Sequence, residues 1–371
     1  MKVLVTGCAG FIGMHVARRL LARGDEVVGI DNLNDYYDPQ LKRARLGTLT
    51  LEPGFRFVAG DIADPGTVQA VLSSAAARRV VHLAAEVGVR NSVVHPERYV
   101  RTNLLGFGHV LEACRQCGVE HLVYASSSSV YGADEQVPFS VHSPTDHPVS
   151  LYAATKKSNE LMAHVYSHLH GLPATGLRYF TVYGPWGRPD MSPWLFASAI
   201  VEGRPIEVFN HGQMRRDYTY VDDIAEGTVR ALDHVPQRGC VASGAAEHAA
   251  CEAAPYRVYN LGNGRSVELT AFIATLEDAL HLEARKKELP MQPGDVPVTC
   301  ADISETKREL GFEPQVPLTT GVGRFVEWYL AYRQQPRVGR ATAQRPTIER
   351  RRAPRARWWV PEQGEGGRPA A

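Results

Sequence analysis

The stretch Thr6-Gly7-Cys8-Ala9-Gly10-Phe11-Ile12-Gly13 decides how this chain folds. It joins an apolar run at residues 3–6 to a segment whose apolar residues recur at helical spacing. Gly7 permits a tight turn, Gly10 lets the backbone approach a pyrophosphate, and Gly13 lets the helix pack closely on the strand. A pyrophosphate would bind the free N–H groups at the start of that helix. The pattern predicts a dinucleotide site, with Phe11 and Ile12 in the same turn.

Strand-like and helix-like segments alternate through the first half of the chain. Apolar runs typical of strands lie at residues 3–6, 27–30, 55–58, 80–83 and 122–125, and a helical stretch spans about 96–117. This alternation predicts an α/β fold with a doubly wound parallel sheet of the Rossmann type.

The second half is interrupted by Pro and Gly and predicts a smaller C-terminal substrate lobe. Strands are expected at 175–178 and 206–209, and helices at about 222–234, 270–281 and 318–333. We assign residues 1–175 to the dinucleotide-binding domain, to which later elements return, and 176–333 mainly to the substrate lobe. The Ala-rich segment 236–255 is interpreted as a surface loop, and the Arg-rich tail 336–371 as disordered.

The composition and the N-terminus argue against a membrane-spanning, a secreted or a disulfide-linked protein. The 371 residues are 44% hydrophobic and 22% charged, as in ordinary globular proteins. The chain has no apolar run of about 18 residues, and its N-terminus does not resemble a signal peptide, so a cytoplasmic protein is expected. Six cysteines lack the spacing of a disulfide framework, and Cys114 and Cys117 are interpreted as helix thiols, with no metal site.

The tail at residues 336–371 carries nine Arg and three Glu, whereas the whole chain has a net charge of only +1. An unselected extension is favoured over a role for the tail in binding nucleic acid or a membrane.

Acidic residues at two strand ends refine the cofactor. Asp31 ends the second strand, 18 residues after Gly13. A carboxylate there can accept both ribose hydroxyls of NAD and would repel a 2′-phosphate, so NAD is favoured over NADP. Asp61 and Ile62 follow the third strand, where they can meet the adenine. The alternative for such an Asp is a turn cap.

A phenol and an amine lie one helical turn apart at Tyr152 and Lys156. A free tyrosine has a pKa of about 10, and a nearby lysine cation, with the positive nicotinamide, would favour the phenolate. The pair can therefore act as a general base on a hydroxyl whose carbon loses hydride. The run Ser126–Ser129 follows the fifth predicted strand and can supply hydroxyls to a sugar.

Together these motifs resemble the extended short-chain dehydrogenase/reductase family of NAD-dependent epimerases and dehydratases. His82-Leu83-Ala84-Ala85, Val130-Tyr131-Gly132 and the Y-x-x-x-K pair carry the likeness. Four stretches are similar in sequence to UDP-glucuronate 4-epimerases, namely residues 126–132, 148–157, 179–191 and 208–212. The similarity covers about residues 1–333.

The resemblance implies a reaction and a set of residues. UDP-glucuronate would be converted to UDP-galacturonate through a 4-keto intermediate, with Tyr152 as the base, Ser127 as the proton relay and Lys156 holding the nicotinamide ribose. NAD would be regenerated in each turnover. Further cofactor contacts are implied at Asn32, Leu83, Ala84, Ala85, Asn103 and Tyr179.

The substrate residues are also implied by the resemblance. Ser128, Ser129, Thr181 and Arg188 are expected around the sugar carboxylate, and Arg188 can form a bidentate pair. For the remainder of the UDP-sugar the family pattern implies Arg90, Phe209, Arg216 and Asp295. A homodimer is implied through the helices near 98–117 and 150–170.

Related activities remain as alternatives. Decarboxylases and 4,6-dehydratases of the family carry a Glu directly before Val-Tyr-Gly, where this chain has Ser129. A UDP-glucose 4-epimerase shares the Tyr, Lys and Ser, and a non-catalytic NAD-binding protein would typically lose the Tyr or the Lys. The chain departs from the sugar-acid branch at Glu86, Asn91 and Val141, where Gln, Tyr and an acidic residue are usual.

Overall fold

The computed structural model describes residues 1–134, 136–239, 254–292 and 295–334. Residues 1–333 form one compact unit. Most of the predicted loop at 236–255 and the predicted disordered tail at 336–371 lie outside the described residues.

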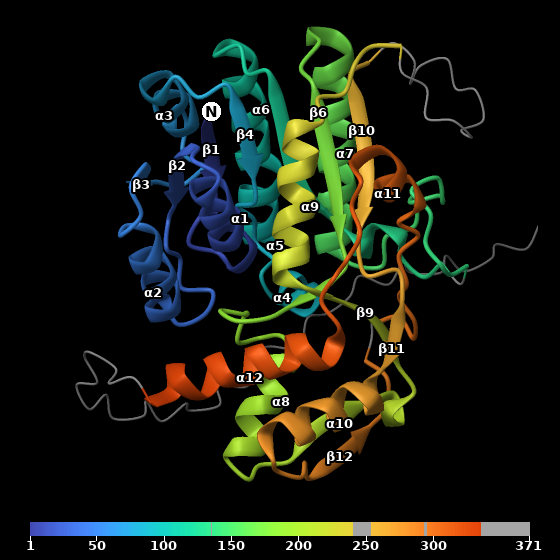
Figure 1. The fold of residues 1–371 in the computed structure, drawn as a ribbon. Helices are drawn as coiled ribbons and strands as arrows, with labels where there is room; N and C mark the ends of the chain where they lie inside the picture. Colours follow the sequence, from blue (N-terminus) through green and yellow to red (C-terminus); the bar gives the residue numbers. More distant parts are fainter. Residues whose placement is uncertain (135, 240–253, 293–294, 335–371) are drawn as a thin grey trace, which may run out of the picture. The chain divides into compact units, whose positions relative to one another are not determined.

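A seven-stranded sheet forms the centre of this unit (Figure 1). Its strands are β1 (Lys2–Thr6), β2 (Glu26–Asp31), β3 (Phe55–Ala59), β4 (Arg79–His82), β5 (His121–Ser127), β6 (Ala174–Tyr179) and β10 (Tyr256–Leu261). All neighbours pair in parallel, in the order β10-β6-β5-β4-β1-β2-β3. The chain order reverses between β1 and β4, which is where ligands bind in sheets of this kind. The predicted doubly wound parallel sheet is confirmed.

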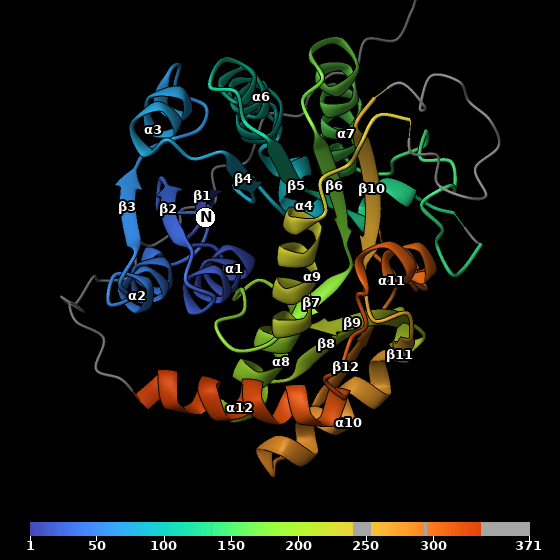
Figure 2. The same cartoon turned by 45° about the horizontal axis from the view of Figure 1, so that its top comes forward.

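Helices cover both faces of the sheet (Figure 2). On one side lie α1 (Phe11–Ala22), α2 (Pro39–Leu49) and α9 (Val221–Asp233), and on the other α3 (Thr67–Ala75), α6 (Phe107–Gln116) and α7 (Leu151–His170). The predicted helix at 96–117 is divided into α5 (Pro96–Tyr99), a π-helical segment η1 (Val100–Gly106) and α6. Val3 and Val5 point into one hydrophobic core and Leu4 into the other, because successive strand residues alternate between faces. The sheet is therefore buried on both sides.

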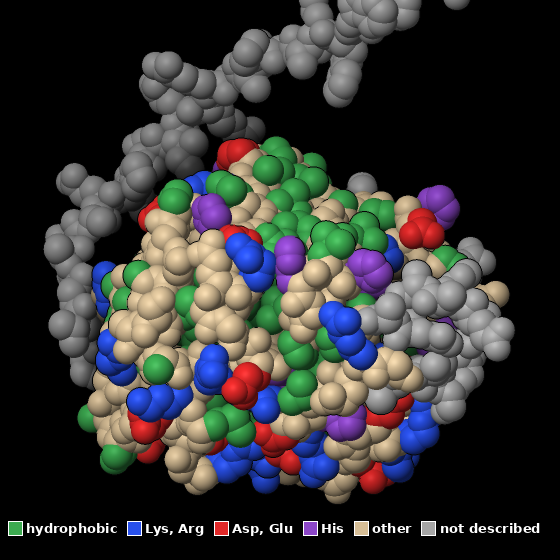
Figure 3. Space-filling view, turned by 90° about the horizontal axis from the view of Figure 1, so that it is seen from above, with side chains coloured by type: hydrophobic (Ala, Val, Ile, Leu, Met, Phe, Trp, Pro, Cys, Tyr) green, Lys and Arg blue, Asp and Glu red, His purple; other side chains and the backbone are tan. Residues whose placement is uncertain are grey.

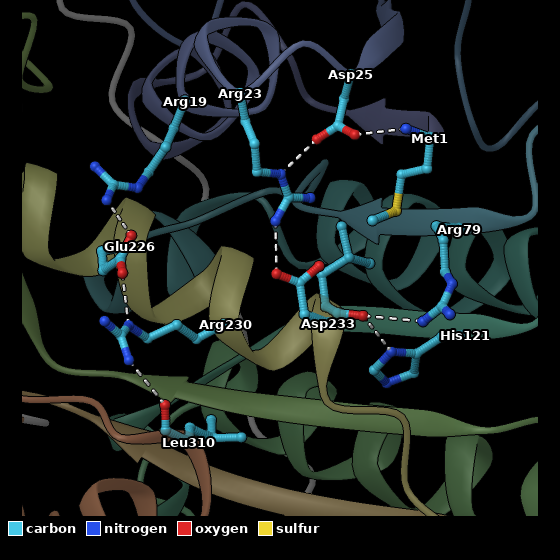
Figure 4. Close-up of polar contacts among 11 residues, drawn as sticks. Met1, Arg19, Arg23, Asp25, Arg79, His121, Glu226, Arg230, Asp233 and Leu310 are labelled. Carbon is cyan, nitrogen blue, oxygen red and sulfur yellow. Dashed lines mark hydrogen bonds and ion pairs between the residues drawn. The ribbon is translucent and has the colours of Figure 1, made fainter.

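Polar contacts join α1 to α9, and α9 to the sheet (Figure 4). Arg23 binds Asp25 at 2.7 Å and Asp233 at 2.5 Å. At the end of α9, the Leu232 carbonyl oxygen lies 3.0 Å from both an Arg79 nitrogen and Nδ1 of buried His121. These side chains satisfy the carbonyl end of the helix, as polar side chains near a helix C-terminus commonly do.

A second group of elements lies beyond the carboxyl ends of the central strands (Figure 1). It contains a three-stranded sheet of β11 (Ser266–Glu268), β9 (Arg215–Tyr220) and β7 (Thr181–Tyr183), and a parallel pair of β12 (Lys286–Leu289) and β8 (Ile206–Phe209). Its helices are α8 (Ser192–Val201), α10 (Leu269–Leu280) and α12 (Leu318–Gln334). The remaining short helices are α4 (Val89–Val94), α11 (Ser304–Leu310), η2 (Ser128–Tyr131) and η3 (Asn210–Gly212). One continuous hydrophobic core contains Val5 of the central sheet together with Phe272 and Phe325 of this group.

Candidate active site

A cleft of about 980 Å³ brings the carboxyl ends of the central strands together with the second group of elements. Every residue that the sequence assigned to cofactor or substrate lines this cleft, with the exception of Asn103. Those lining it are Gly7, Gly10, Phe11, Ile12, Gly13, Asp31, Asn32, Asp61, Ile62, Leu83, Ala84, Ala85, Arg90, Ser127, Ser128, Ser129, Tyr152, Lys156, Tyr179, Thr181, Arg188, Phe209, Arg216 and Asp295.

The glycine positions of the turn have no room for a side chain. Gly7 has φ 71°, and a Cβ there would lie 2.7 Å from the backbone nitrogen of Ala84. A Cβ on Gly13 would lie 2.1 Å from the Gly7 carbonyl oxygen. Helix α1 begins directly after Gly10, and no side chain caps its first N–H groups, which face the turn. This geometry suits a bound pyrophosphate.

Asp31 supports the glycine turn as well as lining the cleft. Its carboxylate accepts hydrogen bonds from the N–H of Ala9 at 3.1 Å and of Leu33 at 2.8 Å. Burial raises the pKa of Asp31, while these hydrogen bonds and the charges of Lys42 and Arg45 oppose the rise. Asp31 therefore caps the turn, which was the alternative role, and its contact with the ribose of NAD stays a prediction.

Asp61 lies at the same end of the cleft. It accepts a hydrogen bond from the Ala63 N–H at 2.9 Å and pairs with Arg101 at 2.9 Å. Although burial acts to raise it, these contacts hold the pKa of Asp61 below its usual value. The carboxylate is therefore ionised and held at the rim.

Asn103 lies behind the cleft wall, in contrast to the predicted cofactor contact. It is buried, and its amide bonds both backbone groups of Glu86, at 2.9 Å and 3.0 Å. Its Nδ2 is also 3.0 Å from the Thr155 hydroxyl. Because its polar atoms are used in this way, Asn103 fixes the loop after β4 onto α7 and does not face the cleft.

Tyr152 and Lys156 both face the cleft from α7, which Ser150 caps by accepting the Ala153 N–H at 3.1 Å. Lys156 is buried and donates to the Ala125 carbonyl oxygen at 2.9 Å, and burial lowers its pKa to about 8. Burial raises the pKa of Tyr152, and a hydrogen bond with Ser127 and the charge of Arg188 oppose this rise. The sequence predicted that Lys156 and the positive nicotinamide together would favour the phenolate of Tyr152. Among the protein's own groups, desolvation of the phenolate dominates and raises the pKa of Tyr152.

The four serines divide between two roles. β5 extends through Ser127, so Ser126 and Ser127 belong to the strand and not to the loop that the sequence predicted after it. Ser126 is buried and donates to Glu160 at 2.6 Å, so its hydroxyl is not available to a sugar. Ser127 points the other way and bonds the Ser129 hydroxyl and N–H, both at 3.2 Å. The serine hydroxyls available in the cleft are therefore those of Ser127, Ser128 and Ser129.

Arg188 reaches the cleft already paired. Its Nε lies 3.0 Å from Asp190, its Nη2 bonds the other carboxylate oxygen, and the side chain is 19% exposed. Tyr36 donates to the same Asp190 carboxylate at 3.0 Å. One edge of the guanidinium is thereby occupied by protein, and the bidentate pair that the sequence expected with a substrate is made with Asp190 along that edge.

The remaining substrate candidates form a second group in the lining of the cleft. Arg90 pairs with Asp295 at 3.2 Å and lies over the Phe209 ring, 4.8 Å from its centre. Arg216 donates to the backbone oxygen of Pro297 at 3.2 Å. These side chains offer cations and an aromatic face, which suit a diphosphate and a base.

Tyr179 contributes differently from Thr181, although both lie in the cleft wall. The Tyr179 hydroxyl is 2.9 Å from that of Thr228, a buried residue, so it points away from the cleft. Thr181 begins β7 and is partly exposed. Of the two, Thr181 has the hydroxyl available to a ligand.

Two buried residues that the sequence analysis did not select organise the site. Arg45 is fully buried and donates to the carbonyl oxygens of Ala9 (3.2 Å), Trp186 (2.6 and 3.0 Å) and Gly187 (3.0 Å). Tyr99 places its ring edge against Tyr152, 6.2 Å between centres. The burial of Arg45 has no signature in the sequence.

Other expectations concern groups away from the cleft. Cys114 is buried and Cys117 partly exposed on the α6 side, and the described residues contain no cluster of His, Cys, Asp or Glu able to hold a metal. Among the described helices, none combines the length and apolar character needed to cross a bilayer.

Comparison with known proteins agrees with this architecture. Residues 3–243 match the NAD dependent epimerase/dehydratase family. A probable UDP-glucuronate 4-epimerase from Rhizobium meliloti (strain 1021) is 46% identical over 331 residues, which are 89% of this chain and 97% of the relative. The crystal structure of a UDP-glucuronic acid 4-epimerase from Bacillus cereus, in complex with UDP-glucuronic acid and NAD, matches with a TM-score of 0.79 at 33% identity, covering 90% of this chain and all of that one. A UDP-glucose 4-epimerase from Thermus thermophilus, in complex with NAD, matches with a TM-score of 0.76 at 31% identity, covering 89% of this chain and 99% of that one. The chain belongs to the NAD dependent epimerase/dehydratase family.

Proposed function

We propose that this protein is an NAD-dependent UDP-glucuronate 4-epimerase. The cofactor would lie along the glycine turn with its adenosine ribose at Asp31, because Gly7, Gly10 and Gly13 leave no room for a Cβ there and the carboxylate disfavours a 2′-phosphate. Residues 1–175 would mainly hold the cofactor, and residues 176–333 mainly the UDP-sugar.

The observation that carries the proposal is the placement of a cation beside the reactive phenol. Arg188 and Tyr152 line the same cleft, and the charge of Arg188 opposes the rise in the pKa of the phenol. The same cleft is lined by the hydroxyl-bearing residues Ser127, Ser128, Ser129 and Thr181. A hydroxyl group and an Arg are the partners that a sugar carboxylate needs.

The side chains divide the proton transfer between them. Tyr152 would take the proton of the sugar 4-hydroxyl, and Ser127, which bonds the phenol, would relay it. NAD, when bound, supplies the hydride acceptor and later donor for C4 through a 4-keto sugar. Lys156, fixed by the Ala125 carbonyl, would hold the nicotinamide ribose. Return of hydride to the opposite face would invert C4, while Arg216, Asp295 and Phe209 retain the UDP moiety.

A second candidate, UDP-glucose 4-epimerase, is favoured by one observation. Asp190 already neutralises Arg188, which reduces the net attraction of this region for a carboxylate. Purified protein incubated separately with UDP-glucuronate and UDP-glucose distinguishes the two. NMR should show UDP-galacturonate without release of carbon dioxide; conversion of UDP-glucose alone would contradict the proposal. Arg188→Ala should reduce turnover of UDP-glucuronate more than that of UDP-glucose, and equal losses would remove its assigned role.

We also propose a homodimer through η1, α6 and α7. Leu161, Val165 and Leu169 are 58%, 48% and 66% exposed at helical spacing on α7, and Leu105 is 52% exposed on η1. Figure 3 shows hydrophobic side chains gathered beside histidines toward the side where α6 and α7 lie. Exposed apolar patches of this kind mark interfaces. Analytical ultracentrifugation should give twice the mass of one chain for the parent and for the control Leu51→Arg, whose site is 84% exposed elsewhere, but a smaller mass for Leu161→Arg. A monomeric parent would refute the proposal.

A further inference from the structure

We infer that Tyr36 is a specificity-determining positioning residue, which through Asp190 holds Arg188 in the orientation that receives the carboxylate of a sugar acid. This inference rests on the proposed function. It assigns to Tyr36, on the cofactor side of the cleft, a part in selecting the substrate. Tyr36 lies in the loop between β2 and α2, directly after the Asp31 region, whereas Arg188 and Asp190 precede α8.

The first step is the geometry of the pair. Arg188 uses Nε and one N–H of Nη2 on the two oxygens of Asp190, which fixes the plane of the guanidinium. The opposite edge, formed by Nη1 and the second N–H of Nη2, is then the one left for a planar anion. Arg188 lines the cleft and is 19% exposed, so a ligand can reach it.

The second step is the contact that fixes Asp190. Its Oδ2 accepts the Tyr36 hydroxyl at 3.0 Å, and the Arg188 guanidinium lies 5.8 Å from the centre of the Tyr36 ring. The phenol therefore restrains both partners of the ion pair. Without this donor, Asp190 could turn with its Arg, and the free edge would no longer have one direction.

The third step is the space that the loop after β4 leaves. Gly88 has φ 101°, and a Cβ there would lie 2.8 Å from the Tyr36 hydroxyl and 3.9 Å from Arg188 Nη2. The same two loops are joined by a hydrogen bond of 3.1 Å from Asn34 to Glu86. Tyr36, in its own loop, thus lies against two others, and its hydroxyl has a defined place.

The consequence for ligands follows from charge. A neutral hydroxymethyl group can accept a hydrogen bond from Arg188 in several orientations, but a carboxylate requires two N–H groups in one plane. Loss of the Tyr36 hydroxyl should therefore weaken binding of a sugar acid more than that of a neutral sugar with the same UDP moiety.

The test is isothermal titration of NAD-loaded protein with UDP-glucuronate and UDP-glucose. All proteins titrated carry Tyr152→Phe, so that neither sugar is turned over. Tyr36→Phe should raise the Kd of UDP-glucuronate about fivefold or more and leave that of UDP-glucose within about twofold. The control Tyr259→Phe removes a similar hydroxyl–carboxylate hydrogen bond, to Glu309, away from the cleft, and should change neither Kd.

A double-mutant cycle tests the route through Asp190. In an Asp190→Ala background, Tyr36→Phe should have no further effect on UDP-glucuronate; an undiminished effect would overturn the inference. Equal weakening of both sugars by Tyr36→Phe, or of neither, would also overturn it. Epimerisation of UDP-glucuronate by the unmodified chain is measured in parallel: its absence overturns the proposed function and this inference with it, whereas its presence confines any failure to Tyr36.

Discussion

Arg45 gives the sharpest test of how the cofactor side and the substrate side of the cleft are held together. It is fully buried in α2, and its guanidinium donates to backbone oxygens of Ala9, Trp186 and Gly187. Arg45→Met should leave these three carbonyl groups without that donor. At about 1 kcal/mol for each unsatisfied group, the free energy of unfolding should fall by about 3 kcal/mol.

A second effect works against this loss. Methionine removes the cost of burying an unpaired guanidinium, since the described contacts of Arg45 are carbonyl groups and the Tyr37 hydroxyl and include no carboxylate. Hydrogen bonds from a charged donor are stronger than neutral ones, and we expect them to outweigh that cost. Arg45→Lys keeps the charge but cannot reach all three oxygens, so it should fall between the parent and Arg45→Met.

The assay is urea unfolding followed by circular dichroism, with Arg43→Met as the control. Arg43 is exposed on the same helix, and its replacement should change the free energy of unfolding by less than about 0.5 kcal/mol. If Arg45→Met lies within about 1 kcal/mol of the parent, the carbonyl network does not stabilise the junction, and the reasoning is wrong.

Three other predictions concern the site and the core. Tyr152→Phe should lower kcat by about 10²–10⁴-fold with NAD still bound, measured by NMR of the product sugar; turnover near that of the parent would contradict its role as base. Gly13→Ala should abolish tight NAD binding by calorimetry, because its Cβ would lie 2.1 Å from a backbone oxygen, whereas Gly47→Ala, with open space around it, should bind normally; equal affinities would refute the turn geometry. Burial lowers the pKa of His82 to about 3 and of His121 to about 4. In the unfolded chain both histidines take up protons near pH 6.5, so the free energy of unfolding should fall as the pH drops from 6.5 toward 4, by up to about 1.4 kcal/mol per pH unit for each His. A free energy of unfolding in urea that does not change with pH would exclude this.

The central sheet was predictable because its strands are buried on both faces and appear in sequence as short apolar runs. Helix α2 was not predicted, although Asp38 caps it and Pro39 opens it. The residues that α2 buries include Lys42 and Arg45, and a pattern that assigns charged residues to solvent cannot find such a helix. Strand β12 was also not predicted, because its sequence Lys-Lys-Glu-Leu is mostly exposed and has no apolar run typical of a strand.

The candidate site divides in the same way. Asp31, the glycines and the Tyr152–Lys156 pair follow local spacing rules, so the sequence could place them. Tyr36 and Asp190 are 154 residues apart, and no local pattern connects them. The direction of the Tyr152 pKa also depends on burial in the folded cleft, which sequence spacing does not report.

The core that contains Val5, Phe272 and Phe325 has a consequence for engineering. Since side chains from both halves interdigitate there, the chain is not modular: a chimaera that grafts the C-terminal half of a relative would cut through close-packed apolar contacts. New sugar preferences are therefore more accessible by exchanging individual side chains at the rim of the cleft than by recombining whole segments.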